Sequence, residues 1–488
     1  MKSKTTALSQ QLQLYTHNPA LVIFAWMLVA AAALAAGLLH ALVGNLILVA
    51  GVLACLLLKH LSRSLDGLCR DLLFISLTAG FMGNSLLTYS LAGISVTPFR
   101  LLMLVSAVVF LAGLLFSGSL ELEPIYVQDY LFFFAFWFFY AFISLAWAPD
   151  KFAAISDLLF FFLSFLLIFF TVYYIRTPRD ISSLYKLWLV MAGAFLLFAL
   201  FENITGLHLP ISKINEYAPH LRQIPTAVFH NQNDFATFLA LSFPFFLALA
   251  RYKQGLPRLA AVAFIPLLLY ILVETRSRAN YLSLGLQLFF FYFFLLRGAG
   301  KLKLAALALG GGLLTFLASP GTYIRAWNIF SSQLSQLIAG FSLDYGSVFV
   351  RLNLIQNGLL FLFQSRFFGV GAGNVEYHMA HNPVFDTRGI VNMHNWWFDL
   401  LVGYGAIIFI AFILFYITLF LNLYLYWRRG GEAVRFLVEP LLLALVGFTL
   451  ASISSSRITY LTFIWALFGY ALAVLNHLRS NNIVEEDQ

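Results

Sequence analysis

Three short polar stretches each precede a long apolar segment, and they carry side chains that could bind and transfer a charged group. The stretches are His230-Asn231-Gln232-Asn233-Asp234, Thr275-Arg276-Ser277-Arg278-Ala279 and His394-Asn395. If the apolar segments are helices, each stretch lies at a helix N terminus, where unpaired amides and the positive end of the helix dipole favour an anion. Taken singly, Asn233 or Ser277 could be an ordinary N-cap. Together, the three stretches predict one polar pocket that binds an anion.

Arg351 lies on the apolar side of a further predicted helix, residues 347–365. Residues at helical spacing from it, such as Leu362, are apolar, whereas the polar residues of this segment fall on another face. An arginine in such surroundings needs an anionic partner, and arginines at membrane level are functional candidates. The alternatives are a side chain that reaches sideways to solvent, or an ion pair with Asp344 or Glu376.

The elements that must position these residues are membrane-spanning helices. The chain has 488 residues, of which 61% are hydrophobic and 10% charged, with a mean hydropathy of +0.87. Most of its surface must therefore face lipid or other spans, which excludes a soluble globular enzyme and favours an all-α, polytopic integral membrane protein.

Fourteen apolar segments approach the ~20 residues that a helix needs to cross a bilayer. They predict about 12–14 transmembrane helices, since the first four segments could form hairpins that do not fully cross. The segments are residues 20–39, 41–58, 72–91, 98–116, 129–147, 155–175, 184–203, 234–250, 258–274, 279–296, 303–318, 396–427, 436–453 and 457–476.

The positive charges predict the orientation of the chain. With the N terminus in the cytoplasm, 18 of the 29 Lys and Arg residues fall on the cytoplasmic side. An even number of spans then places the C terminus in the cytoplasm as well. Nine of the 11 positive residues on the outer side are arginines. This excess is either chance or phosphate recognition, because a guanidinium meets two phosphate oxygens at once and an ammonium does not.

The longest interval without a full apolar segment is residues 320–394. Loops of that length usually carry function, and this one contains four arginines, three histidines and the run Gly369-Val370-Gly371-Ala372-Gly373-Asn374. We expect it to be the catalytic part of the protein. The predicted organisation is N-terminal transmembrane helices in residues 1–203, central helices with arginine-bearing outer loops in 204–319, an extracytoplasmic catalytic loop in 320–395, C-terminal helices in 396–476 and a cytoplasmic tail in 477–488.

Five parts of the second half of the chain, in this order and at these spacings, resemble the O-antigen ligase and polymerase family. The first half resembles that family only in its helical topology. The five parts are Phe229-His230-Asn231-Gln232-Asn233-Asp234, Thr275-Arg276-Ser277-Arg278-Ala279-Asn280-Tyr281-Leu282, Arg351, the glycine run at 369–374, and His394-Asn395.

The resemblance implies a metal-independent, integral membrane glycosyltransferase of the GT-C type, without a cofactor, in the cytoplasmic membrane of a bacterium. Members of the family take sugar chains from an undecaprenyl diphosphate carrier outside that membrane. The expected partners are an undecaprenyl-diphosphate-linked oligosaccharide donor, a sugar acceptor, the lipid bilayer and other polysaccharide-assembly proteins, with no nucleic acid. A polymerase of the teichuronic acid, O-antigen or capsule type is favoured over a ligase.

The family pattern implies a role for individual residues of this chain. Arg278, followed after three residues by Leu282, and Arg351 would bind the diphosphate, and His394 would be the catalytic base. Their chemistry agrees, because a neutral imidazole can accept the proton of an acceptor hydroxyl while guanidinium groups neutralise the leaving group. A helix N terminus would also keep His394 neutral. Further candidates, for diphosphate binding and for support, are Arg276, Asn395, His230 and Asn233.

Two positions near Gly405 depart from the family pattern. Ile408 stands where a small residue or Tyr is expected, and Gly403 stands where an acidic residue is common. These departures concern the acceptor rather than the fold. Trp396 and Trp397 fit either an aromatic belt at the membrane interface or stacking on a sugar ring.

Two other interpretations compete with the metal-free enzyme. His378, His381 and His394 could form a metal site, but their spacing matches no zinc signature and no acidic ligand clusters with them. A transporter or flippase for a polysaccharide or lipid-linked sugar would also use many spans and internal arginines. Transporters usually carry ionisable groups near the middle of the membrane. Here the polar stretches gather at the outer rim, which favours the enzyme.

Overall fold

The computed structural model describes residues 41–60, 65–83, 88–91, 94–116, 124–296, 298–303, 347–455 and 457–481, together with scattered single residues between 305 and 335. The predicted span at 20–39 and most of the span at 303–318 lie outside the described residues, as does most of the segment 320–346.

Most of the described residues are helical, and the strands among them form one short antiparallel hairpin, in which Tyr89 pairs with Val96. Its elements are α3 (Ala41–His60), α4 (Leu65–Phe81), β1 (Tyr89–Leu91), β2 (Ile94–Val96), α5 (Pro98–Phe116), α6 (Gln128–Ser144), α7 (Lys151–Tyr174), α8 (Pro178–Thr205), η1 (Lys213–Glu216), η2 (Pro219–Leu221), α9 (Gln232–Tyr252), α10 (Leu256–Glu274), α11 (Arg278–Phe290), the π-helical turn η3 (Phe291–Leu295), α14 (Ser347–Gln364), α15 (Val375–His381), α16 (Trp396–Arg429), α17 (Glu432–Ala451), η4 (Ile458–Tyr460) and α18 (Thr462–Ser480).

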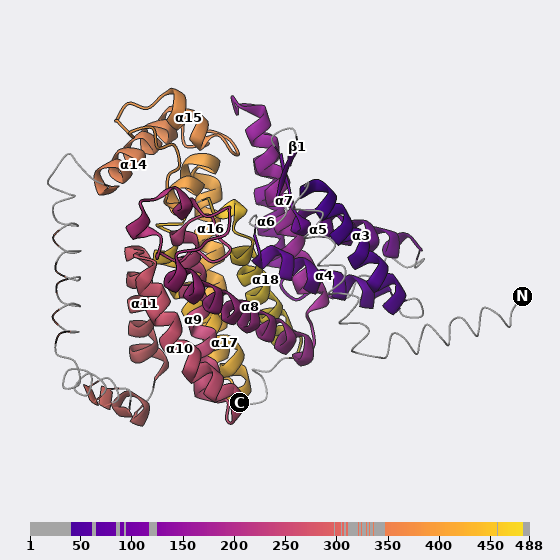
Figure 1. The fold of residues 1–488 in the computed structure, drawn as a ribbon. Coiled ribbons are helices and arrows are strands. Elements are labelled where there is room, and N and C mark those ends of the chain that lie inside the picture. The colour runs from indigo at the N-terminus through magenta and orange to yellow at the C-terminus, as the bar shows by residue number, and fades with distance from the viewer. Residues whose placement is uncertain are drawn as a thin grey trace, which may run out of the picture.

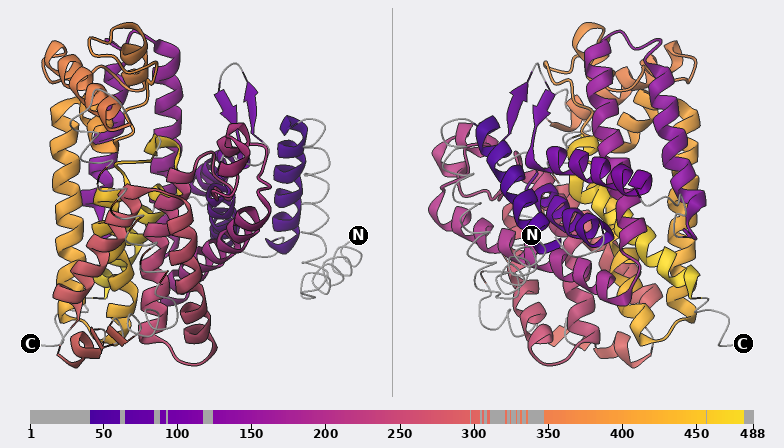
Figure 2. Two further views of the ribbon diagram at one scale, coloured as in Figure 1. Left: turned by 60° about the vertical axis from the view of Figure 1, so that its left-hand side comes forward. Right: turned by 90° about the vertical axis from the view of Figure 1, so that its right-hand side faces the viewer.

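Within the described residues, seven helices are long and apolar enough to cross a membrane. The predicted all-α, polytopic membrane fold is therefore confirmed. The longest helix, α16, runs along the height of the bundle (Figure 2). The seven are α5, α7, α8, α9, α10, α16 and α17.

The predicted span at 72–91 was wrong in its boundaries. The helix α4 begins earlier and ends at Phe81, because Gly83 turns the chain with φ +63° and its amide bonds back to the carbonyl of Gly80. The apolar residues that follow in the sequence belong in part to strand β1 rather than to the helix. Hydropathy alone does not separate the end of a helix from the strand that follows it.

Local capping signals fix the ends of α8, which extends beyond the predicted span at 184–203. Thr177 and Asp180 form a capping box at its start, with Pro178 in the first helical position. Gly206, with φ +70°, ends the helix in the left-handed conformation.

The two C-terminal helices form the centre of the bundle. Helix α17 packs against α9, α11 and α16, and helix α18 packs against α7 and α4. Almost every residue of α18 between Phe463 and Leu478 is buried, and Figure 1 shows this helix between α7 and the group that contains α9 and α17. The helices that carry the polar stretches are therefore packed on a common core.

A buried carboxylate fixes the end of this core that is remote from the polar stretches. The carboxylate of Glu439, which has no exposed surface, accepts from Arg251 Nη1 at 2.8 Å and from the hydroxyl of Tyr252 at 2.7 Å. Trp427 Nε1 donates to the same carboxylate at 3.2 Å. These donors come from the ends of α9 and α16, so the buried carboxylate of Glu439 joins α17 to both helices.

Residues 347–394 form a cap at one end of the bundle, above α16 (Figure 1). Helices α14 and α15 pack on each other and on α16. The cap has its own apolar cluster, which includes Leu354, Phe361, Met379 and Met393 and reaches Val402 of α16. Part of the predicted loop is therefore folded and fixed to the bundle.

The glycine run of the cap pairs with an opening in α16. At Gly405 the helix departs from helical geometry, with φ 79° and ψ 177°. The backbone freed there bonds to the run: Val370 N donates to Val402 O at 2.9 Å, and Ala406 N donates to Phe367 O at 2.9 Å. A Cβ atom at Gly369 would lie 2.5 Å from the amide nitrogen of Gly405, so only glycine fits. The run holds the cap in position.

Candidate functional site

The three polar stretches meet around residues 452–455, the segment that follows α17. Asn280, in the first turn of α11, donates from Nδ2 to Ser277 Oγ at 2.9 Å, to Ser454 Oγ at 3.3 Å and to Asn233 O at 3.5 Å. The amide of Trp396, at the start of α16, donates to Ser452 O at 3.1 Å. The N termini of α9, α11 and α16 therefore lie together, as their sequences suggested.

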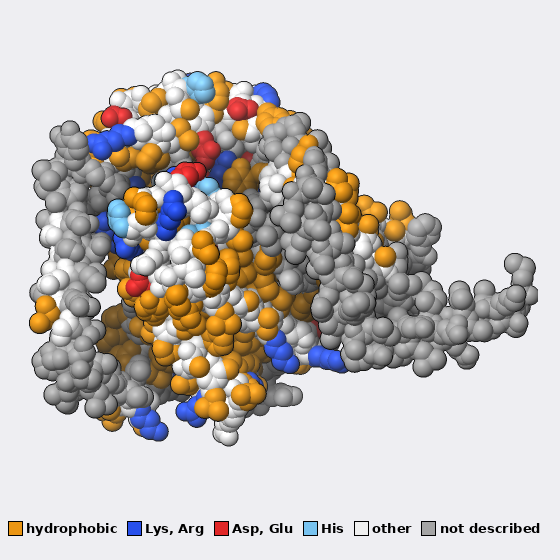
Figure 3. Space-filling view, in the orientation of Figure 1, with side chains coloured by type: hydrophobic (Ala, Val, Ile, Leu, Met, Phe, Trp, Pro, Cys, Tyr) orange, Lys and Arg blue, Asp and Glu red, His pale blue; other side chains and the backbone are white. Residues whose placement is uncertain are grey.

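Figure 3 shows a hollow below the cap with basic, acidic and histidine side chains around it. Three charged groups from different elements act electrostatically on His394, which precedes α16. They are Arg351 of α14, Lys213 of η1 and Glu376 of α15.

Of the two expected N-caps, Ser277 holds the N-cap position and Asn233 does not. Helix α9 is capped by Asn231, whose Oδ1 accepts from the amides of Asn233 and Asp234, so Asn233 is not the cap. Ser277 holds the N-cap position of α11 but makes no capping hydrogen bond, and its hydroxyl contacts Ser454 at 3.5 Å instead. The first turn of α11 is therefore tied to the segment after α17.

His394 lies in a short turn held by its neighbours. Its backbone has φ 47°, in the left-handed region that a non-glycine residue rarely adopts. Its amide donates to Asn392 Oδ1 at 2.8 Å, and Asn392 Nδ2 donates to Glu376 Oε1 at 3.0 Å. Asn395 then caps α16 by accepting from the amides of Trp397 and Phe398. Both flanking asparagines fix the backbone that presents the imidazole.

The imidazole of His394 is suited to accept a proton. Its Nδ1 atom is buried and has no hydrogen-bond partner among the described residues. The pKa of His394 is lowered from its ordinary value, first by burial, then by the positive charges of Arg351 and Lys213, while Glu376 acts in the opposite direction. The direction is the expected one, but burial is the main cause rather than the helix N terminus. Such a histidine stays neutral at neutral pH.

Arg351 lies on the inner face of α14. The pKa of Arg351 is lowered by burial and by the positive charge of Arg278, so the two arginines are near each other. Arg351 makes no ion pair with a carboxylate of the described residues, Glu376 included, and Asp344 lies outside them. The predicted apolar face is also present, since a Cβ atom at Gly358 would contact Met393 at 2.9 Å.

The polar face of α14 forms hydrogen bonds with the loop that follows α15. Asn357 Nδ2 donates to Phe385 O at 2.8 Å, and Asn357 Oδ1 accepts from the amides of Val384 and Phe385. Asn353 Nδ2 donates to Asp386 O at 2.8 Å. These two asparagines fasten the loop between α15 and His394, so the amphipathic pattern of α14 positions both sides of the site.

The remaining candidate residues lie around this centre. Arg276 is exposed in the turn between α10 and α11, with φ 55°, and its amide donates to Val273 O at 3.0 Å. His230 Nδ1 contacts Ile211 O at 2.8 Å, and the ring lines a separate cavity beside the start of α9. Asn233 contributes through its carbonyl, which faces Asn280.

The other two histidines of the cap are not gathered with His394. His381 stacks on Tyr377 with ring centroids 4.3 Å apart, and the ring of His378 lies against Phe361. The described residues contain no group of three His, Cys, Asp or Glu side chains that could hold a metal ion. The three histidines therefore do not form the alternative metal site.

Trp396 and Trp397 do not form an aromatic belt. Trp396 is 5% exposed and packs on Phe412 and Phe448, and Trp397 Nε1 donates to Thr449 O at 3.1 Å. The rings lie inside the bundle because α16 enters it directly after His394. They fix the base of the turn that carries the histidine.

A buried ionic network beside the site was not recognised from the sequence. Arg457 Nη2 lies 3.3 Å from Asp157 Oδ1, and Arg457 Nε lies 4.0 Å from Asp399 Oδ2. The hydroxyl of Tyr404 donates to Asp157 Oδ2. Arg457, one of the outer arginines, therefore pairs inside the protein. The available signals were two acidic residues, Asp157 and Asp399, within predicted spans.

Comparison with known proteins bears on what this site does. Residues 261–413 match the model of the family described as O-antigen ligase. The match contains Arg276, Arg278, Arg351, the glycine run and His394, all of which carried the resemblance in the sequence. The resemblance to the O-antigen ligase and polymerase family is confirmed.

A curated relative supports the same family over a larger part of the chain. The protein is 29% identical over 420 residues to the "Teichuronic acid biosynthesis protein TuaE" of Bacillus subtilis (strain 168). The similarity covers 85% of this chain and 86% of the relative. It therefore extends beyond the O-antigen ligase region into the N-terminal helices, where motifs gave no resemblance.

Proposed function

We propose that this protein is an extracytoplasmic glycosyltransferase that polymerises undecaprenyl-diphosphate-linked oligosaccharide units into a cell-envelope polysaccharide. The O-antigen ligase match supports polysaccharide assembly by a ligase- or polymerase-type transfer. The name of the relative, which concerns teichuronic acid, favours a polymer of that type and therefore a polymerase. The proposed location is the bacterial cytoplasmic membrane, with both chain termini in the cytoplasm.

One observation carries the proposal. His394, which has a buried imidazole nitrogen without a partner among the described residues, lies in the electrostatic field of Arg351, and Arg351 lies in that of Arg278. A neutral base next to two guanidinium groups is the arrangement that a transfer from a diphosphate carrier requires. Arg351 has no counterion among the described residues that would make its role structural.

The residues then divide the reaction between them. His394 accepts the proton of an acceptor hydroxyl as that oxygen forms a bond to the anomeric carbon of the donor sugar. The bond from the anomeric carbon to the carrier phosphate breaks, and its electron pair leaves with the undecaprenyl diphosphate. Arg278 and Arg351 stabilise the charge that grows on this leaving group, with bidentate hydrogen bonds that an ammonium group does not form.

The two arginines make the proposed mechanism independent of a metal ion. In many transferases a divalent cation neutralises the diphosphate leaving group. Here two guanidinium groups at the site would supply the same charge, with Arg276 at the nearby turn as a further contact for the phosphates. Asn395, His230 and Asn233 support the site through the N termini of α9 and α16.

The test is a reconstituted reaction with defined components. Purified protein in nanodiscs receives a synthetic polyprenyl-diphosphate oligosaccharide, with a chelator present throughout, and the products are separated by length. A ladder of lengthening chains would support a polymerase, and a single transfer to a different acceptor would support a ligase. In proteoliposomes, which separate an inner from an outer solution, movement of the lipid-linked sugar across the bilayer without a new glycosidic bond would contradict both and favour a transporter. Loss of turnover on chelation would contradict the metal-independent mechanism.

A further inference from the structure

Arg100 is a buried cation that the proposed reaction does not use. It lies in the first turn of α5 and is only 9% exposed. Its guanidinium carbon lies 3.7 Å from the centroid of the Phe160 ring, and Nη1 donates to the carbonyl and hydroxyl of Ser95, just before the helix. No carboxylate of the described residues forms an ion pair with it.

A buried guanidinium without a counterion is unfavourable unless it serves an anion. The contacts with Phe160 and Ser95 hold the group in one orientation, since the ring fixes its plane and the strand residue fixes one edge. This arrangement is rigid before any ligand binds. The edge of the guanidinium that does not bond to Ser95 is therefore the part that can bind a ligand.

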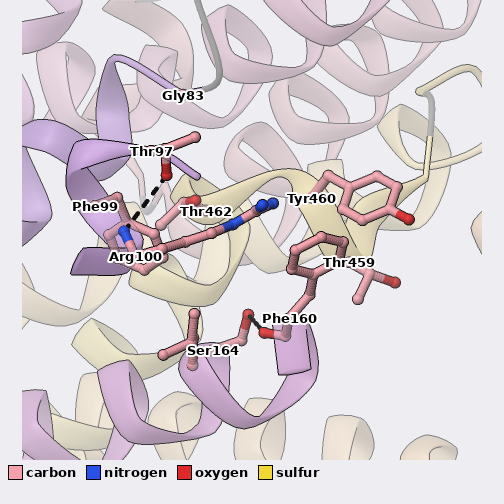
Figure 4. A pocket seen from close by; sticks show the side chains of 10 residues that line it. Gly83, Thr97, Phe99, Arg100, Phe160, Ser164, Thr459, Tyr460 and Thr462 are labelled. Atoms are coloured by element: carbon pink, nitrogen blue, oxygen red, sulfur yellow. Dashed lines mark hydrogen bonds between the residues drawn. The ribbon is translucent and has the colours of Figure 1, made fainter. Parts of the chain in front are cut away.

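The free edge of Arg100 faces a narrow pocket. Figure 4 shows the Arg100 side chain extended toward Tyr460 and Phe160, with Thr462 beside its stem and Thr459 beside Phe160. The pocket has a volume of about 10 Å³, which is the space of one water-sized group. A carboxylate oxygen fits this space, whereas a whole sugar ring does not.

The narrow pocket adjoins a larger cavity, since Gly83, Tyr460 and Thr462 line both. The larger cavity has a volume of about 300 Å³, at the lower end of the range for ligand pockets. Phe229 and Phe463 supply aromatic walls. Aromatic faces pack against the C–H surfaces of a sugar ring.

Two polar side chains also line the larger cavity. They are His230 and Asp234, whose imidazole and carboxylate can form hydrogen bonds with sugar hydroxyls. The carboxylate of Asp234 also accepts from Asn231 Nδ2 at 2.7 Å, which fixes its position. Together the two pockets offer a place for one ring and, at one end, a place for one negatively charged group.

The cavity is a neighbour of the proposed transfer site. The carbonyl of His230 accepts from the amide of Lys213 at 2.8 Å, and the charge of Lys213 acts on His394. The N terminus of α9 separates the cavity from α11, since Asn233 faces Asn280 on its other side. A donor bound at Arg278 and an acceptor bound in the cavity would therefore approach His394 from two sides.

We propose that the adjoining pockets bind an acidic sugar of the acceptor chain, with its carboxylate on Arg100 and its ring against the aromatic wall. The inference rests on the proposed function and adds a substrate class to it, a uronic acid in the acceptor. The charged end of that sugar would fix the register of the chain, so that the next hydroxyl reaches His394. Arg100 is then a specificity-determining residue, and it takes no part in the transfer of the proton.

Three matched acceptors test this inference with the full-length protein in nanodiscs. They are an oligosaccharide that carries a uronic acid, the same oligosaccharide with the carboxyl group reduced to the alcohol, and a form with a phosphate in that position. Wild-type protein should prefer the uronic acid over the alcohol. Arg100→Gln should lower kcat/KM for the uronic acid by about 10- to 100-fold, the value of a lost charge-assisted hydrogen bond, and should change kcat/KM for the alcohol little.

Two further variants control for folding and for general charge. Arg100→Lys keeps the charge without the planar group and should retain part of the preference. Arg222→Gln changes an exposed arginine at the end of η2 and should leave both acceptors unaffected. Elution in detergent reports whether each variant is folded, and the ratio between acceptors is measured on one sample, so a general loss of protein cancels.

The outcomes separate the inference from the function on which it rests. Equal losses for the two acceptors in Arg100→Gln would make Arg100 a structural residue and overturn the inference. A wild-type preference for the phosphate form, or no preference at all, would overturn the carboxylate site and leave the transferase intact. A wild-type protein that transfers sugar to none of the acceptors would contradict the proposed function itself.

Discussion

At the scale of single residues, the backbone of His394 carries strain that its neighbours offset. A left-handed conformation costs a non-glycine residue about 1–2 kcal/mol, and His394 has φ 47°. Asn392 bonds to its amide, and Asn395 caps the helix that follows. Strained residues held in this way are common where geometry serves a reaction. The strained backbone of His394 is consistent with an imidazole that is held in one position to act as a base.

The charges around His394 predict that two substitutions shift the pH profile of the transfer rate in opposite directions. The rate should fall as pH drops through the pKa of His394, because the protonated ring accepts no proton. Lys213→Gln removes a charge that lowers this pKa, so the acidic limb should move to higher pH. Glu376→Gln removes a charge that raises it and keeps an oxygen for Asn392, so the limb should move to lower pH.

The measurement is kcat/KM against pH for the wild type and both variants in one buffer series. Shifts in the same direction, or none, would mean that another group controls the acidic limb. Lys213 and Glu376 are not the arginines that are proposed to bind the donor. A change in donor binding alone would alter the height of the pH profile of kcat/KM and not the pH at which it falls.

The two site arginines should not tolerate lysine. Arg278→Lys and Arg351→Lys keep the charge and lose the bidentate contact to phosphate. Each should reduce kcat/KM by about 10- to 100-fold, the range for a charge-assisted hydrogen bond, while the protein remains folded in the membrane. Arg366→Lys is the matched control, because Arg366 is an exposed arginine of the same cap. Full activity in both site variants would mean that these arginines have structural roles.

At the scale of elements, the opening of α16 joins the cap to the bundle. A Cβ atom at Gly405 would collide with the carbonyl oxygen of Phe367, and its φ of 79° also disfavours alanine. Gly389, with φ 74° and nothing within 4 Å of a Cβ atom, has the strain without the collision. Alanine at Gly389 therefore tests backbone strain alone, whereas alanine at Gly405 tests backbone strain together with a steric collision.

Alanine at these glycines gives a stability prediction. Gly389→Ala should cost about 1–2 kcal/mol of local strain and little activity. Gly405→Ala adds a steric collision and should detach the glycine run, with a lower thermal unfolding midpoint and a larger loss of transfer. Thermal unfolding in detergent and transfer rate should be measured for both. Equal effects of the two substitutions would contradict the proposed role of the opening.

Long apolar segments and positively charged turns could be predicted from the sequence because composition and hydropathy determine them. The convergence of the three N termini was inferred from their common geometry, and Asn280 now accounts for it by bonding to two of them. The network of Arg457 could not be predicted, since Asp157 and Asp399 are far apart in the chain. The end of α4 was missed because Gly83 acts through a conformation that hydropathy does not register.

At the scale of the whole molecule, the site lies at one end of the bundle and the ion pair of Glu439 and Arg251 lies toward the other. The positive charges predict that the end with the cap faces outward. Both ends offer an exposed position for labelling, Asn382 after α15 and Gly431 between α16 and α17.

Cysteine labelling tests this orientation. In a background where Cys55 and Cys69 are replaced by alanine, Asn382→Cys should react with a membrane-impermeant reagent in intact cells. Gly431→Cys should react only after the membrane is opened, and a Cβ atom there meets nothing within 4 Å, so the substitution is tolerated. The reverse pattern would place the site in the cytoplasm and contradict an extracytoplasmic transferase.

The central claim is that His394 is the base for transfer from a lipid diphosphate donor, and His394→Ala tests it most directly. Donor binding and product length are measured on the same purified protein in nanodiscs, with a chelator present and His381→Ala as the matched control. The proposed mechanism predicts unchanged donor binding and a loss of transfer of about 10²- to 10⁴-fold, the usual contribution of a general base, with a much smaller loss in His381→Ala. Near-normal transfer by His394→Ala would contradict it.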